Sequence, residues 1–166
     1  MLEKGDIDAL ASVVMPKALH EENSAFKRLF PNFREVESDY YRRTKIFPIM
    51  HTVVIKRELF EREPWIAISL YKAFVQAKEF NYKRLYDSNT LFTSLPWLID
   101  EIENSRRIFG HEIWDYSIEG SRPTLEAFFQ YLDEQGLSRR RMKIEELFAP
   151  NISPEFVRYL RGTGEA

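Results

Sequence analysis

The sequence DYYRRTKIFPIMHTVVIKRELFEREPWIAISLYKAF, residues 39–74, decides the predicted fold. Residues 49–55 within it are rich in β-branched side chains, which is typical of a buried strand. Pro64 then favours the first turn of a long helix. A buried strand followed by a helix that packs across it is half of a βαβ unit, so we expect an α/β fold that is rich in helix.

A second strand is expected at residues 7–14, after a helical turn that Gly5 ends. Further helices are predicted to begin at residues that commonly start helices: Asn32, Ser94 and Pro123. A chain of 166 residues suits one domain, so we expect a single globular unit.

The apolar residues of three predicted helices recur at helical spacing, which predicts one inward face for each helix. For the helix after Pro64 this face is Ile66, Leu70, Ala73, Phe74, Ala77 and Phe80. For the next two helices the inward residues are Leu98, Ile102 and Phe109, and then Leu125, Phe128, Phe129 and Leu132.

The composition excludes several classes of protein. Lys and Arg number 24 against 26 Asp and Glu, so no global basic field indicates a nucleic-acid partner. The absence of cysteine excludes disulfides and thiolate ligands, and no HExxH, GxSxG or Rossmann motif is present, so we expect no metal and no cofactor. No apolar run approaches the roughly 20 residues of a membrane helix, and no signal-peptide core is visible, so a cytoplasmic location without membrane insertion is expected.

His51 lies in the predicted strand among apolar neighbours, and two interpretations stay open for it. A strand histidine is often a hydrogen-bonded core or edge residue. Alternatively, His51 opens the strand at a ligand cleft, where an imidazole moves a proton or binds a carboxylate at neutral pH.

Tyrosines followed by arginines are the candidate substrate-binding residues. They are Tyr40, Tyr41, Arg42 and Arg43, with Tyr116 and Arg122 repeating the pattern before a later helix. For the second group the alternative is that Tyr116 packs in a loop and Arg122 caps the helix or lies on the surface. One arginine of the first pair is expected to clamp a ligand carboxylate, and the other to remain at a solvated helix end. The basic run at residues 138–143, SRRRMK, is followed by two glutamates, so we interpret it as a solvated connector.

The strings DYYRRTKIFPIMHTVVIKRELFEREPW, SLPWLIDEIE and TLEAFFQYLDEQGLSRRRMKIEELFAP resemble the C-terminal half of the 4,5-dihydroxyphthalate decarboxylase family. That family is similar to substrate-binding proteins of ABC transporters, including the thiamine-precursor type. The resemblance implies part of a periplasmic-binding-protein-like type II fold. Residues 1–20 would then end the second lobe and form the crossover, and residues 47–160 would form the C-terminal part of the first lobe.

The resemblance implies a decarboxylase-like protein that acts on a hydroxylated aromatic carboxylic acid without a metal. Its partner would be a small aromatic or other organic carboxylate. Because such ligands lie between two lobes, we expect the chain to be inactive alone and to need either a missing N-terminal half or a second copy. The alternative is a solute-binding module that clamps a small organic anion for an ABC transporter and needs no proton donor.

Overall fold

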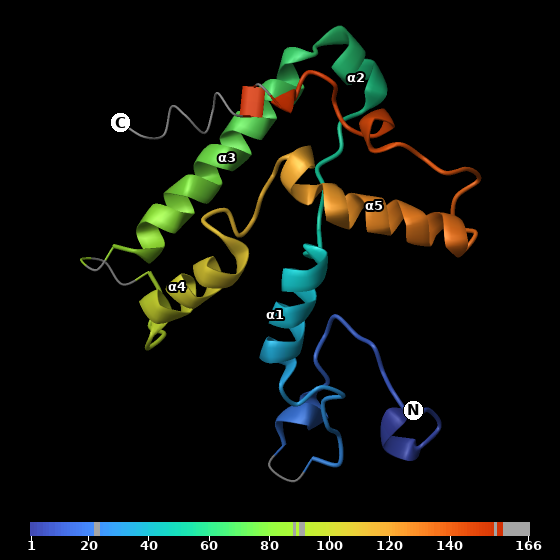
Figure 1. Cartoon of the computed structure of the whole chain (residues 1–166), viewed down its shortest axis with the longest axis vertical. Helices are drawn as coiled ribbons and strands as arrows, with labels where there is room; N and C mark the ends of the chain where they lie inside the picture. The colour runs from blue at the N-terminus through green and yellow to red at the C-terminus, as the bar shows by residue number, and fades with distance from the viewer. Residues whose placement is uncertain (22–23, 88, 90–91, 155, 158–166) are drawn as a thin grey trace. The chain divides into compact units, whose positions relative to one another are not determined.

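A computed structural model describes residues 1–21, 24–87, 89, 92–154 and 156–157 (Figure 1). Where the sequence predicted one globular unit, the chain divides into two compact units, Met1–Glu37 and Ser38–Ala166. The assignment of residues 1–20 and 47–160 to lobes stays a prediction. The predicted site residues all belong to the second unit.

The described part of the chain is rich in helix, as predicted. Its elements in chain order are η1 (Leu2–Lys4), η2 (Lys17–His20), α1 (Phe33–Thr44), α2 (Arg57–Arg62), α3 (Trp65–Leu85), α4 (Leu98–Phe109), α5 (Ile118–Glu134) and η3 (Ile144–Glu146). None of these helices is both long enough and apolar enough to cross a membrane.

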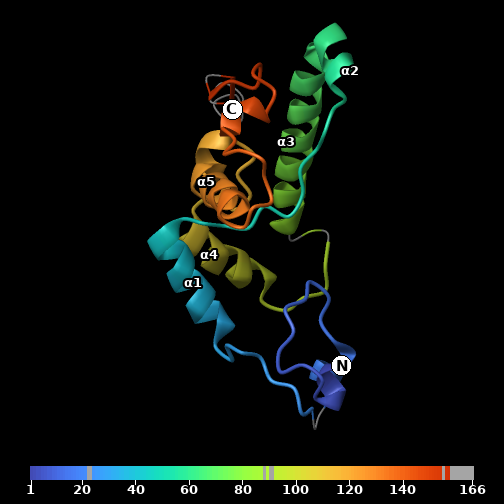
Figure 2. The same ribbon diagram turned by 90° about the vertical axis from the view of Figure 1, so that its right-hand side faces the viewer.

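The predicted strands at residues 7–14 and 49–55 are absent, and no strand occurs among the described residues. Figure 2 shows the chain between α1 and α2 as a thin extended trace. Val53 is 60% exposed and Val54 is 88% exposed. A strand requires a neighbour for its backbone N–H and C=O groups, so a β-branched composition is not sufficient without one. The α/β arrangement is therefore not confirmed.

The local signals for helix ends were more accurate than the signal for the start of α5. Gly5 (φ 71°) follows η1 and Gly110 (φ 87°) ends α4, as predicted, because glycine adopts a left-handed conformation without steric cost. The prediction for α5 is wrong at its start. Ser117, whose Oγ accepts a hydrogen bond from the Gly120 N–H, caps the helix, and Pro123 lies inside it.

The core of the second unit lies where α5 meets η3. Leu125, Phe129 and Ile144 are buried together, and the partly buried residues packed on them are Ile118, Leu132, Met142 and Phe148. The predicted inward face of α5 is thus confirmed except for Phe128, which is 53% exposed.

The predicted inward face of α3 is wrong in large part. Phe74 is 45% exposed and Phe80 is 62% exposed, while Ala67 is the buried residue among those described in α3. The amphipathic pattern identified an apolar face, but burial needs a second surface to cover that face.

Candidate functional site

Tyr41 belongs to an aromatic cluster with Phe47, Phe109 and Trp114. The ring centroid of Phe109 lies 4.7 Å from that of Tyr41 and 4.9 Å from that of Phe47, which in turn lies 4.8 Å from Trp114. The Thr124 hydroxyl on α5 accepts a hydrogen bond from the Phe47 N–H and donates one to the Phe47 carbonyl, both at 3.0 Å. The predicted ligand-binding Tyr41 is therefore held by aromatic packing.

The two arginines at the end of α1 differ. Arg43 Nε lies 2.8 Å from Asp39 Oδ2, one helical turn away, and both side chains are more than half exposed. Arg42 is exposed and has no ion-pair partner among the residues the structure describes. Of this pair, Arg42 is the cation available to a ligand. Tyr40, two positions earlier in the chain, is 41% exposed.

His51 lies on the extended segment between α1 and α2, and its residue is exposed. The core interpretation of His51 therefore does not fit this structure. Within the described residues no hydrogen bond joins His51 to either arginine of α1, so its proposed catalytic role rests on the sequence.

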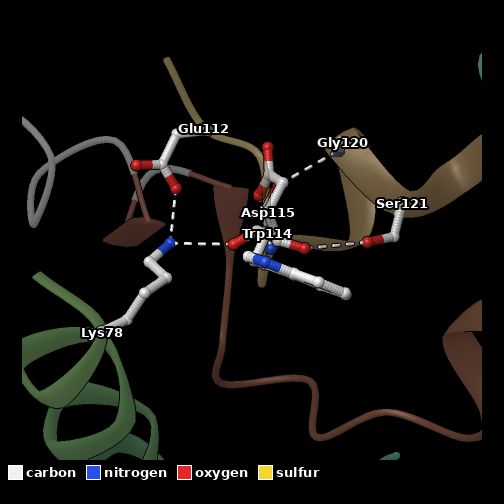
Figure 3. A network of polar contacts seen from close by, with 7 residues as sticks. Lys78, Glu112, Trp114, Asp115, Gly120 and Ser121 are labelled. Carbon is white, nitrogen blue, oxygen red and sulfur yellow. Dashed lines mark hydrogen bonds and ion pairs between the residues drawn. The ribbon is translucent and has the colours of Figure 1, made fainter. Parts of the chain in front are cut away.

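Lys78 on α3 is the centre of a polar network that the sequence analysis missed (Figure 3). Its side chain is only 8% exposed, and its ammonium forms an ion pair with Glu112. The same nitrogen donates a hydrogen bond of 3.0 Å to the Trp114 carbonyl and lies 4.6 Å from the centroid of the Tyr116 ring. No local motif marks Lys78, because its partners lie more than thirty positions along the chain.

The loop that carries Tyr116 is fixed to the start of α5. The Asp115 carboxylate accepts a hydrogen bond from the Ser117 N–H at 2.7 Å, and the Ser121 hydroxyl donates to the Asp115 carbonyl at 3.1 Å (Figure 3). A Cβ atom at Gly120 would lie 2.0 Å from Asp115 Oδ2, so this close approach needs glycine.

A small depression borders the Lys78 network, lined by Tyr71, Val75, Lys78, Glu79, Glu112, Tyr116 and Val157. Its volume of about 20 Å³ has room for about one water molecule and not for an aromatic acid. Nearby, burial raises the pKa of the Tyr82 phenol, and the Trp114 backbone partly opposes that shift. The network therefore positions the loop and offers no ligand cavity.

Arg122 lies in a larger groove of about 180 Å³ beside α5, called here the α5 groove. Its lining residues are Arg122, Glu126, Phe129, Arg141, Met142, Lys143, Ile144 and Glu145. Arg122 lies 3.1 Å from Glu145 and 3.9 Å from Glu126. A backbone hydrogen bond and the one from Arg122 lower the pKa of Glu145, so this carboxyl is charged at neutral pH.

The structure thus separates the predicted site residues into different surroundings. Tyr41 is in the aromatic cluster, Tyr116 is over Lys78, Arg122 is in the α5 groove, and Arg42 and His51 are exposed. The described residues contain no group of three or more metal-ligating side chains. Whether the predicted residues share one ligand stays a prediction.

No family model matches the chain. In sequence, the chain is 32% identical over 150 residues to 4,5-dihydroxyphthalate decarboxylase from Comamonas testosteroni. The match covers 90% of this chain and 46% of the relative, so the chain spans about half the length of the curated relative it matches. The resemblance predicted from the three sequence strings is therefore confirmed: over most of its length, the chain is similar to about half of 4,5-dihydroxyphthalate decarboxylase.

Proposed function

We propose that the chain is a decarboxylase-like protein that acts on a hydroxylated aromatic carboxylic acid of the 4,5-dihydroxyphthalate type. The observation that carries this proposal is the 32% identity to a decarboxylase over 90% of the chain. The solute-binding alternative is less well supported, because the relative is named as an enzyme.

The chemistry needs a proton donor and a cation. In 4,5-dihydroxyphthalate each carboxylate lies para to a hydroxyl group. Loss of the phenolic proton pushes electron density onto the ring carbon that bears the carboxylate, and a general acid protonates that carbon. The carbon–carboxylate bond then breaks, its electron pair returns to the ring, and CO₂ leaves.

His51 is the proposed general acid, because an imidazole exchanges protons near neutral pH and this one is exposed to an incoming ligand. Arg42 or Arg122 would hold the retained carboxylate, since a guanidinium matches a carboxylate with two parallel hydrogen bonds. Tyr40 and Tyr116, both more than 40% exposed, would contact the phenolic hydroxyls.

The proposed fold is one portion of a periplasmic-binding-protein-like type II arrangement. Residues 49–55 would take strand form only when a neighbouring polypeptide supplies backbone partners. That neighbour is either a second copy of this chain or a polypeptide equivalent to the rest of the relative. The exposure of Val53 and Val54 supports this proposal, since an unpaired apolar segment favours association.

Turnover of 4,5-dihydroxyphthalate by the 166-residue chain mixed with a polypeptide equivalent to the rest of the relative tests the function. The chain alone is measured beside it, because it is expected to be inactive. The products to quantify are CO₂ and 3,4-dihydroxybenzoate. His51→Gln should lower the rate by about 10²–10⁴-fold and leave ligand affinity nearly unchanged, whereas His111→Gln, which alters another exposed histidine, should have no effect. No product from the wild-type chain with the added polypeptide would contradict the proposed function. Equal rates for both variants in that mixture would exclude His51.

A further inference from the structure

Helix α3 has one face that the chain itself covers. On this face Ala67 is 5% exposed, and the Lys78 side chain is 8% exposed. Tyr71 and Val75, on the same side of the helix, are partly buried. Lys78 binds the loop before α5, and the Tyr71 ring lies 6.2 Å from the ring of Phe156. The covered face of α3 thus includes a lysine and a tyrosine.

The opposite face of α3 is more apolar and yet uncovered. Leu70 is 36% exposed, Phe74 is 45% exposed and Phe80 is 62% exposed. The small residues Ala73 and Ala77 lie between them and are also exposed. These five residues, called here the α3 stripe, recur at helical spacing and therefore form one continuous surface. Two alanines between larger side chains let another polypeptide approach the helix closely, and a continuous apolar surface of this kind marks an interaction site.

The charges of α3 disfavour a second copy of the chain as the cover. The helix exposes the cations Lys72, Lys83 and Arg84, whereas its acidic residue, Glu79, is partly buried. Two α3 helices packed stripe against stripe would bring like charges together, which costs free energy. A different polypeptide with acidic residues around an apolar surface is complementary to α3.

The match to the relative indicates which polypeptide this is. The 150 matched residues include α3, because this helix lies in the middle of the 166-residue chain. The match covers only 46% of the relative, so about half of the relative is joined covalently to the portion that resembles this chain. Covalent linkage gives that additional half a high effective concentration beside the helix equivalent to α3.

We propose that the α3 stripe is the docking surface for a polypeptide equivalent to the rest of the relative. The proposed function places such a neighbour beside residues 49–55 and assigns nothing to α3, so this inference goes beyond it. The reaction is not needed for the docking, because the contact depends on apolar area and on charge.

Cysteine labelling tests the docking surface, because the chain contains no cysteine of its own. The probe is the part of the relative outside the matched region, co-expressed with the full chain. Ala77→Cys places a thiol in the α3 stripe, and Leu137→Cys places one at a 70% exposed position away from α3. In the complex, maleimide labelling should slow about tenfold or more for Ala77→Cys and less than about twofold for Leu137→Cys. No complex after co-expression, or unchanged labelling of Ala77→Cys within the complex, would overturn the proposal.

Matched lysine substitutions measure the contribution of the stripe to affinity. Phe74→Lys should raise the Kd for the probe about thirtyfold or more, because it removes an aromatic side chain and buries a charge at the contact. Leu137→Lys makes a similar change at an exposed position away from α3 and should change the Kd less than about twofold. Circular dichroism of both variants must match the wild type. Equal Kd values for the two variants would overturn the proposal.

The same labelling detects a second copy as the occupant. If labelling of Ala77→Cys without the probe slows as the chain concentration rises, a second copy covers the α3 stripe, and the proposal is overturned. The results also separate this inference from the proposed function. A complex that protects Ala77→Cys but forms no CO₂ would retain the docking surface and reject the decarboxylase. Formation of CO₂ by a mixture that leaves Ala77→Cys unprotected would reject the docking surface and retain the decarboxylase.

Discussion

Residues 118–148 and residues 49–54 both carry apolar side chains. The first region buries Leu125, Phe129 and Ile144, whereas the apolar side chains of the second are all exposed. In the first, the chain that follows α5 turns back through the basic run, so that Ile144 packs on Leu125 and Phe129. In the second, the extended segment leaves Met50 at 71% and Val54 at 88% exposure. The two regions differ in whether the same chain supplies a covering surface.

The comparison explains why one structural prediction succeeded and the other failed. A helix satisfies its backbone hydrogen bonds within itself, so α5 forms from local sequence and needs only a small partner for its apolar stripe. A strand satisfies its backbone only through another strand, so residues 49–55 depend on a neighbour. High β-propensity therefore predicts where a strand forms if a partner is present.

The largest expected effect is on the free energy of unfolding, in the buried cluster of α5 and η3. Phe129→Ala should destabilise the chain by about 3 kcal/mol, because it removes a ring from the small cluster with Leu125 and Ile144 and leaves a cavity. Phe128→Ala, at the neighbouring and 53% exposed position, should cost less than about 1 kcal/mol. Urea denaturation measures both, and equal losses would show that the α5 cluster is not the core.

The next effect concerns Lys78, whose ion pair with the partly exposed Glu112 joins α3 to the loop before α5. Lys78→Met should cost about 1–2 kcal/mol, because the partly buried Glu112 and the Trp114 carbonyl lose a charged donor. Lys83→Met on the same helix, where the side chain is exposed, should be within about 0.5 kcal/mol of the wild type. Thermal melting compares the pair, and indistinguishable midpoints would mean that the network contributes nothing.

For the exposed residues 49–55 we predict a change in self-association rather than in stability. Val54→Lys should alter the unfolding free energy by less than about 0.5 kcal/mol, because Val54 is 88% exposed. If residues 49–55 pair with a second copy, a lysine there should also weaken self-association, which sedimentation velocity detects. A wild-type chain that stays monomeric at high concentration would contradict pairing through this segment.

The smallest expected effect is a pH dependence at the end of the basic run. The hydrogen bond from Arg140 lowers the pKa of Glu146, so the folded state favours the charged carboxylate. This contribution is present above the unfolded pKa of about 4.3 and is lost as the pH falls through the lower folded value. Because Glu146 is exposed, only a slight fall in melting temperature is expected, and Glu146→Gln should remove it.

The sequence by itself determined the features that depend on neighbours within a few positions. Gly5 and Gly110 end their helical segments, α1 and α4 lie close to their predicted places, and the apolar stripe of α5 faces inward at Leu125 and Phe129. Three strings also carried the resemblance that the comparison with the relative confirms. Each of these rests on backbone conformation, helical periodicity or residue identity, which are properties of the local sequence.

Only the tertiary structure decided which apolar faces are covered and which charges meet. It left the face of α3 with Phe74 and Phe80 largely exposed, and it paired Lys78 with Glu112, thirty-four positions away. It also placed Arg141 and Lys143 beside Phe129, which turned a basic connector into the rim of a groove. Burial and ion pairing depend on the return of distant chain segments, and no local pattern of residues specifies that return.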